Sequence, residues 1–319
     1  MNVTTQQITD DRRLQLVTTP ADLSSWLTDD THRWIDLHWF DTEQLEHFLT
    51  PLDLPATVRE ACRSAPTRPL VISLEDVLFI SVPVDIRDKM LRYLSILVAP
   101  TTVITIQYGT ATSLQDVGAD QSNIRRLVAA YTAGMLHWLL VAVLKETVND
   151  YYRIRTRTID MARTLDRDPT TIDAGDILDL KRTVTPLGVL FEDQMTCVLE
   201  LHQSRSETLR LKTIHAEVTE LLQDLQRGMT IIARLEDRVR DLYQFHLQTL
   251  EETTNRRLKV LTVLSAIYLP STLIAGIYGM NFQYIPVLGM RFGYAMALTL
   301  MIGLVIGQLW FFHRRGWFR

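Results

Sequence analysis

The pattern of apolar and charged positions divides the chain into a charged part and an apolar carboxy-terminal part. Neither residues 260–290 nor residues 292–312 include an Asp, Glu, Lys or Arg, and Arg291 is the one charge between the two runs. A hydrocarbon core of about 30 Å needs about 20 apolar residues at a rise of 1.5 Å per helical residue. The pattern therefore predicts two membrane spans near the carboxy terminus.

The first 110 residues have the pattern of a mixed unit of strands and helices. Short runs rich in β-branched and aromatic residues predict strands at 14–18, 34–38, 70–74, 77–85 and 93–107. Helical patterns lie between them, at 20–27, 41–48 and 55–64. We expect a small sheet with helices packed on it.

From residue 113 to the first span the pattern is helical. One helix is predicted over 120–165, ending at the turn Asp166-Arg-Asp-Pro169, and a second over 176–202. A third begins near Ser206, and neither Gly nor Pro interrupts 230–268, so this helix of about 70 residues continues into the membrane. Its apolar stripe consists of Ile214, Val218, Leu221, Leu225, Ile232, Leu235, Val239, Leu242 and Phe245.

This stripe has two possible partners. It could pack on residues 120–200 of its own chain, or on sister copies in an oligomer. Two spans cannot enclose a polar path whereas several copies can, which favours an oligomer.

The remaining composition gives no sign of catalysis. We find no phosphate-binding Gly-rich loop and no Ser/His/Asp arrangement at a usable spacing, so we expect neither an enzyme nor a bound cofactor. The net charge of −4 says little as an average, and we expect no nucleic-acid partner. Cys62 and Cys197 have no zinc or disulfide spacing and are predicted to be buried thiols. Five carboxylates crowd one turn, where they could cap helices or bind a hard cation: Asp166, Asp168, Asp173, Asp176 and Asp179.

The flanking charges predict the orientation in the membrane. The amino terminus is polar and without an apolar leader pattern. Basic residues flank the outer ends of both spans: Arg256, Arg257, Lys259, Arg314, Arg315 and Arg319. The positive-inside rule then predicts a multi-pass protein of the inner (plasma) membrane with both termini in the cytoplasm.

Small and polar residues follow one face of the first span. Asn255, Leu258, Thr262, Ser265, Leu269, Thr272 and Gly276 recur at intervals of three or four. This face could line a polar path or form a helix interface sealed by small residues. In the second span, Gly303 and Gly307 form a G-x-x-x-G pattern that favours close helix packing.

The first span and the segment after it resemble a known family. The chain reads Asn255-Arg-Arg-Leu-Lys-Val-Leu-Thr-Val-Leu, and then Tyr268-Leu-Pro-Ser-Thr-Leu-Ile-Ala-Gly-Ile-Tyr-Gly-Met-Asn-Phe282. Both stretches resemble the first span and Gly-Met-Asn signature of the two-span CorA family of divalent-cation transporters. The close resemblance covers about residues 250–319, and the soluble part agrees in architecture.

The resemblance implies an α+β fold: a cytoplasmic α/β funnel domain, a long stalk helix and two carboxy-terminal transmembrane helices, assembled as a homopentamer in membrane lipid. The implied ranges are an α/β domain at 1–118, a helical hairpin at 119–205, the stalk helix at 206–259, a pore-lining first span at 260–279, a periplasmic loop with the signature at 280–290, a second span at 291–312 and a basic tail at 313–319.

It also implies roles for individual residues. Gly279, Met280 and Asn281 would form a selectivity filter, with five copies of Asn281 holding a hydrated Mg²⁺ through its waters. The implied pore-lining residues are Asn255, Leu258, Leu261, Thr262, Ser265, Leu269, Thr272 and Gly276, the three leucines forming a hydrophobic constriction. Regulatory divalent metal is implied at Glu220 and Asp224.

Two departures from the family pattern keep alternatives open. The loop Gln283-Tyr-Ile-Pro-Val-Leu-Gly289 has no carboxylate, and Gln244 stands where relatives tend to have Asp. The expected cargo is Mg²⁺, with Co²⁺ or Ni²⁺ also passing. One alternative is a Zn²⁺ transporter of the same superfamily, and another is a membrane-tethered metal sensor or scaffold that does not conduct.

Overall fold

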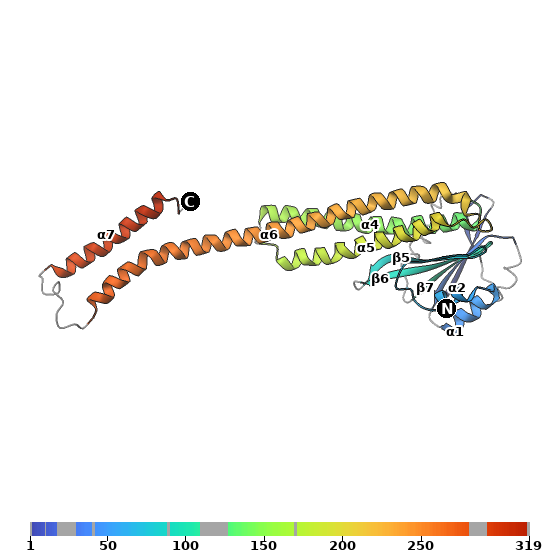
Figure 1. The fold of residues 1–319 in the computed structure, drawn as a ribbon, viewed down its shortest axis with the longest axis horizontal. Coiled ribbons are helices and arrows are strands. Elements are labelled where there is room, and N and C mark those ends of the chain that lie inside the picture. The colour runs from blue at the N-terminus through green and yellow to red at the C-terminus, as the bar shows by residue number, and fades with distance from the viewer. Residues whose placement is uncertain are drawn as a thin grey trace. The chain divides into compact units, whose positions relative to one another are not determined.

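The computed structural model describes residues 2–9, 11–17, 30–39, 42–87, 90–108, 127–168, 171–280 and 292–317. The chain divides into two compact units, Met1–Tyr243 and Gln244–Arg319. Figure 1 shows the elements of each unit. The helix predicted at 20–27 lies outside the described residues.

A seven-stranded sheet forms the first layer of the first unit. Its strands are β1 (Asn2–Ile8), β2 (Leu14–Val17), β3 (Arg33–Trp39), β4 (Leu70–Ser73), β5 (Leu78–Arg87), β6 (Met90–Val98) and β7 (Thr102–Tyr108). They are ordered β2-β1-β3-β7-β6-β5-β4, and β3 pairs with β7 in parallel whereas the other neighbours are antiparallel.

Each face of this sheet is covered by helices (Figure 1). One face packs with α1 (Thr42–Leu49), the short η2 (Thr50–Leu52) and α2 (Ala56–Arg63) around buried Ile35, Leu37, Val58 and Cys62. The other face packs with α4 (Thr132–Arg167), α5 (Ala174–Gln203), η4 (Leu211–Ile214) and α6 (His215–Tyr278). Side chains alternate between the two faces along a strand, which is why Trp34 belongs to the second core and Ile35 to the first.

The apolar stripe of α6 is buried within its own chain. From Ile214 to Val239, every predicted stripe residue is at most 5% exposed and belongs to the core shared with α4 and α5. Leu242 packs against that core from its edge, whereas Phe245 is 44% exposed. This part of α6 therefore needs no sister copy, and the case for an oligomer depends on the second unit.

A buried amide joins three elements of the first unit. Gln194 of α5 donates from Nε2 to the Pro83 carbonyl of β5, at 3.0 Å, and to the Thr147 hydroxyl of α4, at 2.8 Å. The pairing register of β5 shifts between Pro83 and Asp85, a β-bulge or irregularity next to that carbonyl. Gln194 thus connects β5, beside this irregularity, with both helices.

The elements differ from the predicted ones in four places. The run predicted as one strand at 93–107 is two, because the chain turns between Val98 and Thr102 around Pro100. Strand β1, which is rich in Thr and Gln, was not predicted. Residues 127–131 are not helical, because the N–H of Leu127 donates to the Arg12 carbonyl instead. The third long helix begins at His215 after η4, because Arg210 has a positive φ of 53°.

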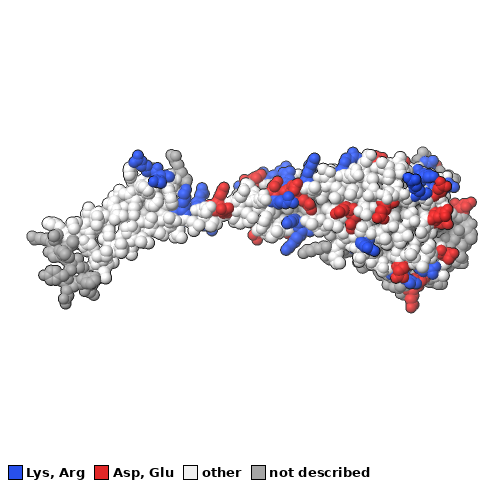
Figure 2. Space-filling view, in the orientation of Figure 1, with Lys and Arg blue, Asp and Glu red and all other residues white. Residues whose placement is uncertain are grey.

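The second unit has two apolar helices, the end of α6 and α7 (Gly293–Arg314). Both are long and apolar enough to span a membrane, with mean hydropathies of 1.9 and 2.0 over their most apolar windows, and only 6% of each window is buried. Figure 2 shows the uncharged surface that these helices present, next to a group of basic side chains. The α+β fold with a long helix and two carboxy-terminal apolar helices is as predicted. The exact domain ranges stay predictions.

The first testable consequence concerns the close approach of α5 and α6. A Cβ added at Gly228 would lie 2.9 Å from Cδ1 of Phe191, a ring that is 2% exposed. We expect Gly228→Ala to destabilise the first unit, because overpacking costs about 1–3 kcal/mol and the gain in helix propensity is about 1 kcal/mol. Thermal unfolding of the full chain measures this. In the control, Gly188→Ala, the Cβ has only ordinary contacts of 3.5 Å and 3.6 Å, so the Tm should hold or rise.

A second testable consequence is that stability should depend on pH through two histidines, His38 and His137. The first of these lies beside a buried cluster of polar side chains on β3 and β7. Asp36 accepts hydrogen bonds from the Thr105 hydroxyl, at 2.5 Å, and from Gln107, at 3.0 Å, and lies 3.3 Å from Nε2 of His38. The hydrogen bond to Asp36 raises the pKa of His38. Burial lowers the pKa of His137 in α4, although Glu217 and Glu220 oppose this.

These two histidines should change stability with pH in opposite directions. A raised folded pKa contributes stability below the unfolded pKa of about 6.5, and that contribution is lost as pH rises through the folded pKa. A lowered folded pKa contributes stability at higher pH that is lost on acidification. We therefore expect His38→Gln to make the slope of Tm against pH more positive between pH 5 and 8, and His137→Gln to make it more negative. Equal slopes in both variants would contradict this assignment.

Candidate ion path on the first span

The end of α6 has one covered side and one open side. Val263 is 7% exposed, whereas Leu258, Leu261 and Leu269 are 53%, 58% and 69% exposed. Thr272 lies nine residues after Val263, about two and a half turns, and hence on the opposite side of the helix. The residues predicted to line a pore are all exposed and cluster around the Thr272 side.

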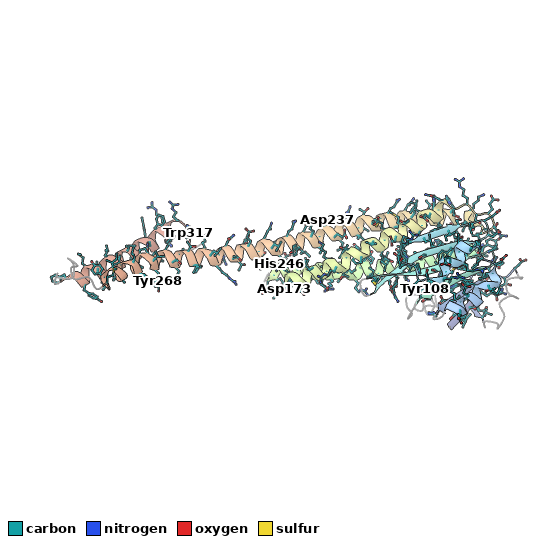
Figure 3. All side chains as sticks on the ribbon, turned by 60° about the horizontal axis from the view of Figure 1, so that its bottom comes forward. Tyr108, Asp173, Asp237, His246, Tyr268 and Trp317 are labelled. Carbon is teal, nitrogen blue, oxygen red and sulfur yellow. The ribbon has the colours of Figure 1, made fainter. Side chains whose placement is uncertain are left out.

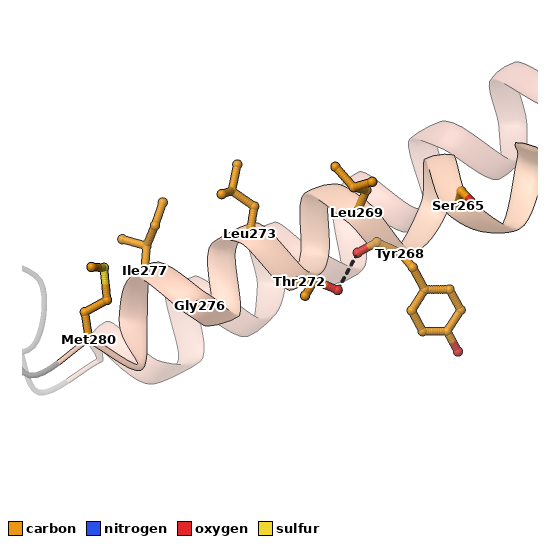
Figure 4. Close-up of a pocket in the computed structure, with 8 residues that line it drawn as sticks. All are labelled: Ser265, Tyr268, Leu269, Thr272, Leu273, Gly276, Ile277 and Met280. Carbon is orange, nitrogen blue, oxygen red and sulfur yellow. Dashed lines mark hydrogen bonds between the residues drawn. The ribbon is translucent and has the colours of Figure 1, made fainter.

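A shallow open groove of about 630 Å³ follows this side of the helix. Figure 4 shows its lining: Ser265, Tyr268, Leu269, Thr272, Leu273, Gly276, Ile277 and Met280. Its lining thus includes four of the predicted pore-lining residues, namely Ser265, Leu269, Thr272 and Gly276, and also Met280 of the predicted filter. Asn255, Leu258, Leu261 and Thr262 lie earlier on α6, outside the groove.

The filter residues follow the end of the helix. The N–H of Gly279 donates to the Ala275 carbonyl at 2.9 Å, so the last turn of α6 extends to the signature. Met280 is half-exposed. Asn281 and the loop 281–291 lie outside the described residues.

The two threonine hydroxyls are oriented as acceptors. Thr262 donates to the Leu258 carbonyl at 2.8 Å. Thr272 donates to the Tyr268 carbonyl, also at 2.8 Å (Figure 4). Because each hydroxyl proton is used inside the helix, only the oxygen lone pairs are left for a ligand. Such an oxygen can accept a hydrogen bond from water bound to a cation.

Backbone features add to this preference for cations. An added Cβ at Gly276 would meet nothing within 4 Å, so the backbone there is open to the groove. The carboxy-terminal end of a helix carries a partial negative charge, and the last turn of α6 has no basic residue to offset it. No carboxylate follows Glu252 in the described part of α6. The site is thus mildly attractive to cations but has no charged ligand.

The predicted regulatory residues are in the first unit. Glu220 and Asp224 are exposed on α6, and Asp224 forms an ion pair with Arg227. Among the described residues, no three His, Cys, Asp or Glu side chains gather as a metal site. The crowded turn before α5 is a helix cap, because Asp173 and Asp176 form a capping box. Both cysteines are buried and free, as predicted.

One contact was not found from the sequence, and one expected contact is not seen among the described residues. The rings of His202 and His215 stack with centroids 4.3 Å apart, and Nε2 of His202 is 3.2 Å from the Thr219 hydroxyl oxygen. No local spacing signals this pair, because the residues lie on different helices. Among the described residues, an added Cβ at Gly303 or Gly307 of α7 would meet nothing within 4 Å, so no described segment packs closely on these two glycines.

Comparison with known proteins assigns this architecture to a family. A family model described as "CorA-like Mg2+ transporter protein" matches residues 29–314. The chain belongs to this CorA-like family. Its fold also matches the structure of the CorA magnesium transporter from Methanocaldococcus jannaschii, with a TM-score of 0.80, 16% identity and 99% of each chain covered.

Proteins that are similar in sequence are also named as CorA transport proteins. A magnesium transport protein CorA of Pasteurella multocida is 35% identical over 125 residues, 38% of this chain and 40% of that relative. A cobalt/magnesium transport protein CorA of Thermotoga maritima is 24% identical over 271 residues, 78% of this chain and 73% of the relative. The chain thus spans less than half the length of the first of these CorA proteins.

The open side of α6 can be tested with introduced cysteines. Burial raises the pKa of Cys62 and of Cys197 to about 12, so neither native thiol should react at neutral pH. We expect Thr272→Cys in liposomes to react with a charged, water-soluble thiol reagent at least about tenfold faster than Ile274→Cys. Ile274 is a matched control, because it lies two residues away at similar depth but on the covered side. Equal rates would contradict a water-filled path along the Thr272 side.

Proposed function

We propose that this chain forms a homopentameric channel or transporter, not an enzyme, that passes hydrated Mg²⁺ across the inner membrane, and also Co²⁺ or Ni²⁺. The observation that carries the proposal is the open side of α6, where a groove, two acceptor hydroxyls and the Gly279-Met280 signature follow one line. Membership of the CorA-like family supports it.

The open shape of this site supports an assembly of several copies. A groove open to its surroundings cannot shield an ion from lipid, since an ion in hydrocarbon is strongly disfavoured. Copies arranged around a common axis would face their Thr272 sides inward and close the path. The number five follows from the resemblance to the family.

The chemistry of the path supports transport of the hydrated ion. Mg²⁺ loses its water reluctantly, and neutral hydroxyl and amide oxygens are weak compensation for that loss. They are suited instead to hydrogen bonds with the bound waters. Rings of Thr272 and of Asn281 would hold the ion in this way, with Gly276 leaving room beside them.

A hydrophobic constriction would close the path at rest. Leu258, Leu261 and Leu269 present exposed side chains on the proposed pore side. Rings of such side chains can gate by expelling water from the pore. Asn255 would lie at the cytoplasmic exit, beyond the last of these rings.

Regulation would come from metal bound between copies. Glu220 and Asp224 are exposed, and no described cluster within one chain completes a site around them. A divalent cation held there by carboxylates of two copies would favour the closed assembly. Both termini would lie in the cytoplasm, with the basic residues flanking the spans on the inner side.

Metal influx into liposomes containing the purified chain tests the proposal. We expect uptake of Mg²⁺ driven by an inside-negative potential, and a loss of at least about tenfold on Asn281→Ala, because the ring of amides would be removed. Gln283→Ala removes another amide of the same loop and should leave uptake unchanged.

The same preparation distinguishes the alternatives. Uptake of Zn²⁺ in place of Mg²⁺ would make the chain a zinc transporter of this family. Metal binding without any influx would make it a tethered sensor. Uptake equal to that of empty liposomes, or undiminished by Asn281→Ala, would contradict the proposed path.

A further inference from the structure

The outer ends of the two apolar helices share a group of basic and aromatic side chains, which we call the basic–aromatic cluster. It consists of Arg256, Arg257 and Lys259 of α6 and Trp310, Phe311, Phe312, Arg314, Arg315 and Trp317 at the end of α7. All five basic side chains are exposed. Figure 2 shows them as a blue group beside the uncharged helices.

A tight turn after α7 builds this cluster. Gly316 has a φ of +72°, which L-residues with a side chain rarely adopt, and its N–H donates to the His313 carbonyl at 3.1 Å. The N–H of Trp317 donates to the Phe312 carbonyl, also at 3.1 Å, and the two rings lie 5.3 Å apart. The turn thus places Trp317 back against α7 (Figure 3).

Cations lie over the aromatic rings of the cluster. Nζ of Lys259 is 5.9 Å from the centre of the Trp317 ring, which connects the start of the first apolar run with the end of the second. The Arg314 guanidinium lies 5.3 Å from the Trp310 ring and that of Arg315 5.2 Å from the Phe311 ring. Aromatic faces attract these cations without neutralising them.

The basic side chains of the cluster form no ion pairs with carboxylates among the described residues. In the described part of the first unit, eight basic side chains form ion pairs with carboxylates. None of the ion pairs among the described residues includes a basic residue of the cluster, although Glu252 lies about one turn before Arg256 and Glu251 about two turns before Lys259. Five positive charges therefore remain for an external anionic partner.

We propose that the basic–aromatic cluster is a binding site for the phosphate of an anionic phospholipid in the inner leaflet. Trp and basic residues at the end of an apolar helix lie at the depth of lipid headgroups, where the phosphates are. Lys259 directly precedes the first uncharged run and Arg314 is the first Lys or Arg after the second, so they are the residues best placed for a phosphate. This inference depends on the proposed membrane insertion and adds a preference for one class of lipid.

Competition between lipids tests the site. The full chain in mild detergent is mixed with equal amounts of phosphatidylglycerol and phosphatidylcholine, and the bound lipids are counted by native mass spectrometry. We expect phosphatidylglycerol to be preferred, and the preference to fall about fivefold for each cation removed, and also as salt is raised. The double variant Lys259→Gln/Arg314→Gln should lose most of it.

The matched control removes one Lys and one Arg elsewhere. Lys212→Gln/Arg240→Gln lies in the first unit and should keep the preference. Gly316→Ala keeps every charge but strains the turn, and should weaken the preference at least about twofold. Equal binding of both lipids by the native chain would overturn the proposal, as would equal losses in the two double variants.

Failure of this inference can be told from failure of the proposed function. A chain that inserts into pure phosphatidylcholine liposomes and conducts Mg²⁺, but shows no preference for phosphatidylglycerol, leaves transport intact and removes the lipid site. The cluster would then be free to face acidic side chains of a neighbouring copy.

Discussion

Backbone N–H and C=O groups that enter a bilayer must be hydrogen-bonded within the protein, and α6, a helix of 64 residues, meets this constraint along its length except at Pro270, which has no N–H to donate. The same helix begins in the core of a soluble unit and ends in an apolar, exposed segment. Its first part buries an apolar stripe against α4 and α5. Its last part has no comparable cover on the Thr272 side, and the candidate ion path is there.

The candidate ion path is lined by polar groups that carry no formal charge. Hydroxyl protons are used up inside α6, the helix end presents partial negative charge, and the described residues after Glu252 include no carboxylate. Such a surface attracts a cation weakly and does not replace its water. If Mg²⁺ passes here as proposed, weak binding would let the ion leave again, and the cost of removing its water would be avoided.

Much of the fold could be predicted because its signals are local. The spans follow from charge-free runs, the stripe of α6 from a helical period, and the strands β3, β4 and β5 from short runs of β-branched and aromatic residues. Strand β1 was missed because Thr5 and Gln6 are buried by pairing with β2 and β3, a non-local effect. Pro100 lies at the turn between β6 and β7, but the apolar residues on both sides of it led to the prediction of a single strand.

The candidate site was predictable in part. The spacing of Thr262, Ser265, Leu269 and Thr272 predicted that these residues share one face of the helix. The structure shows that this face is exposed. The hydroxyl orientations and the contact of Lys259 with Trp317 could not be predicted, because they depend on side-chain geometry and on residues 58 positions apart.

The mass of the assembly in a lipid nanodisc shows most directly whether other copies cover the open side of α6. One chain has a mass of 36.7 kDa. We predict a protein mass five times that of one chain. A protein mass of a single chain, in a preparation that conducts Mg²⁺, would contradict it.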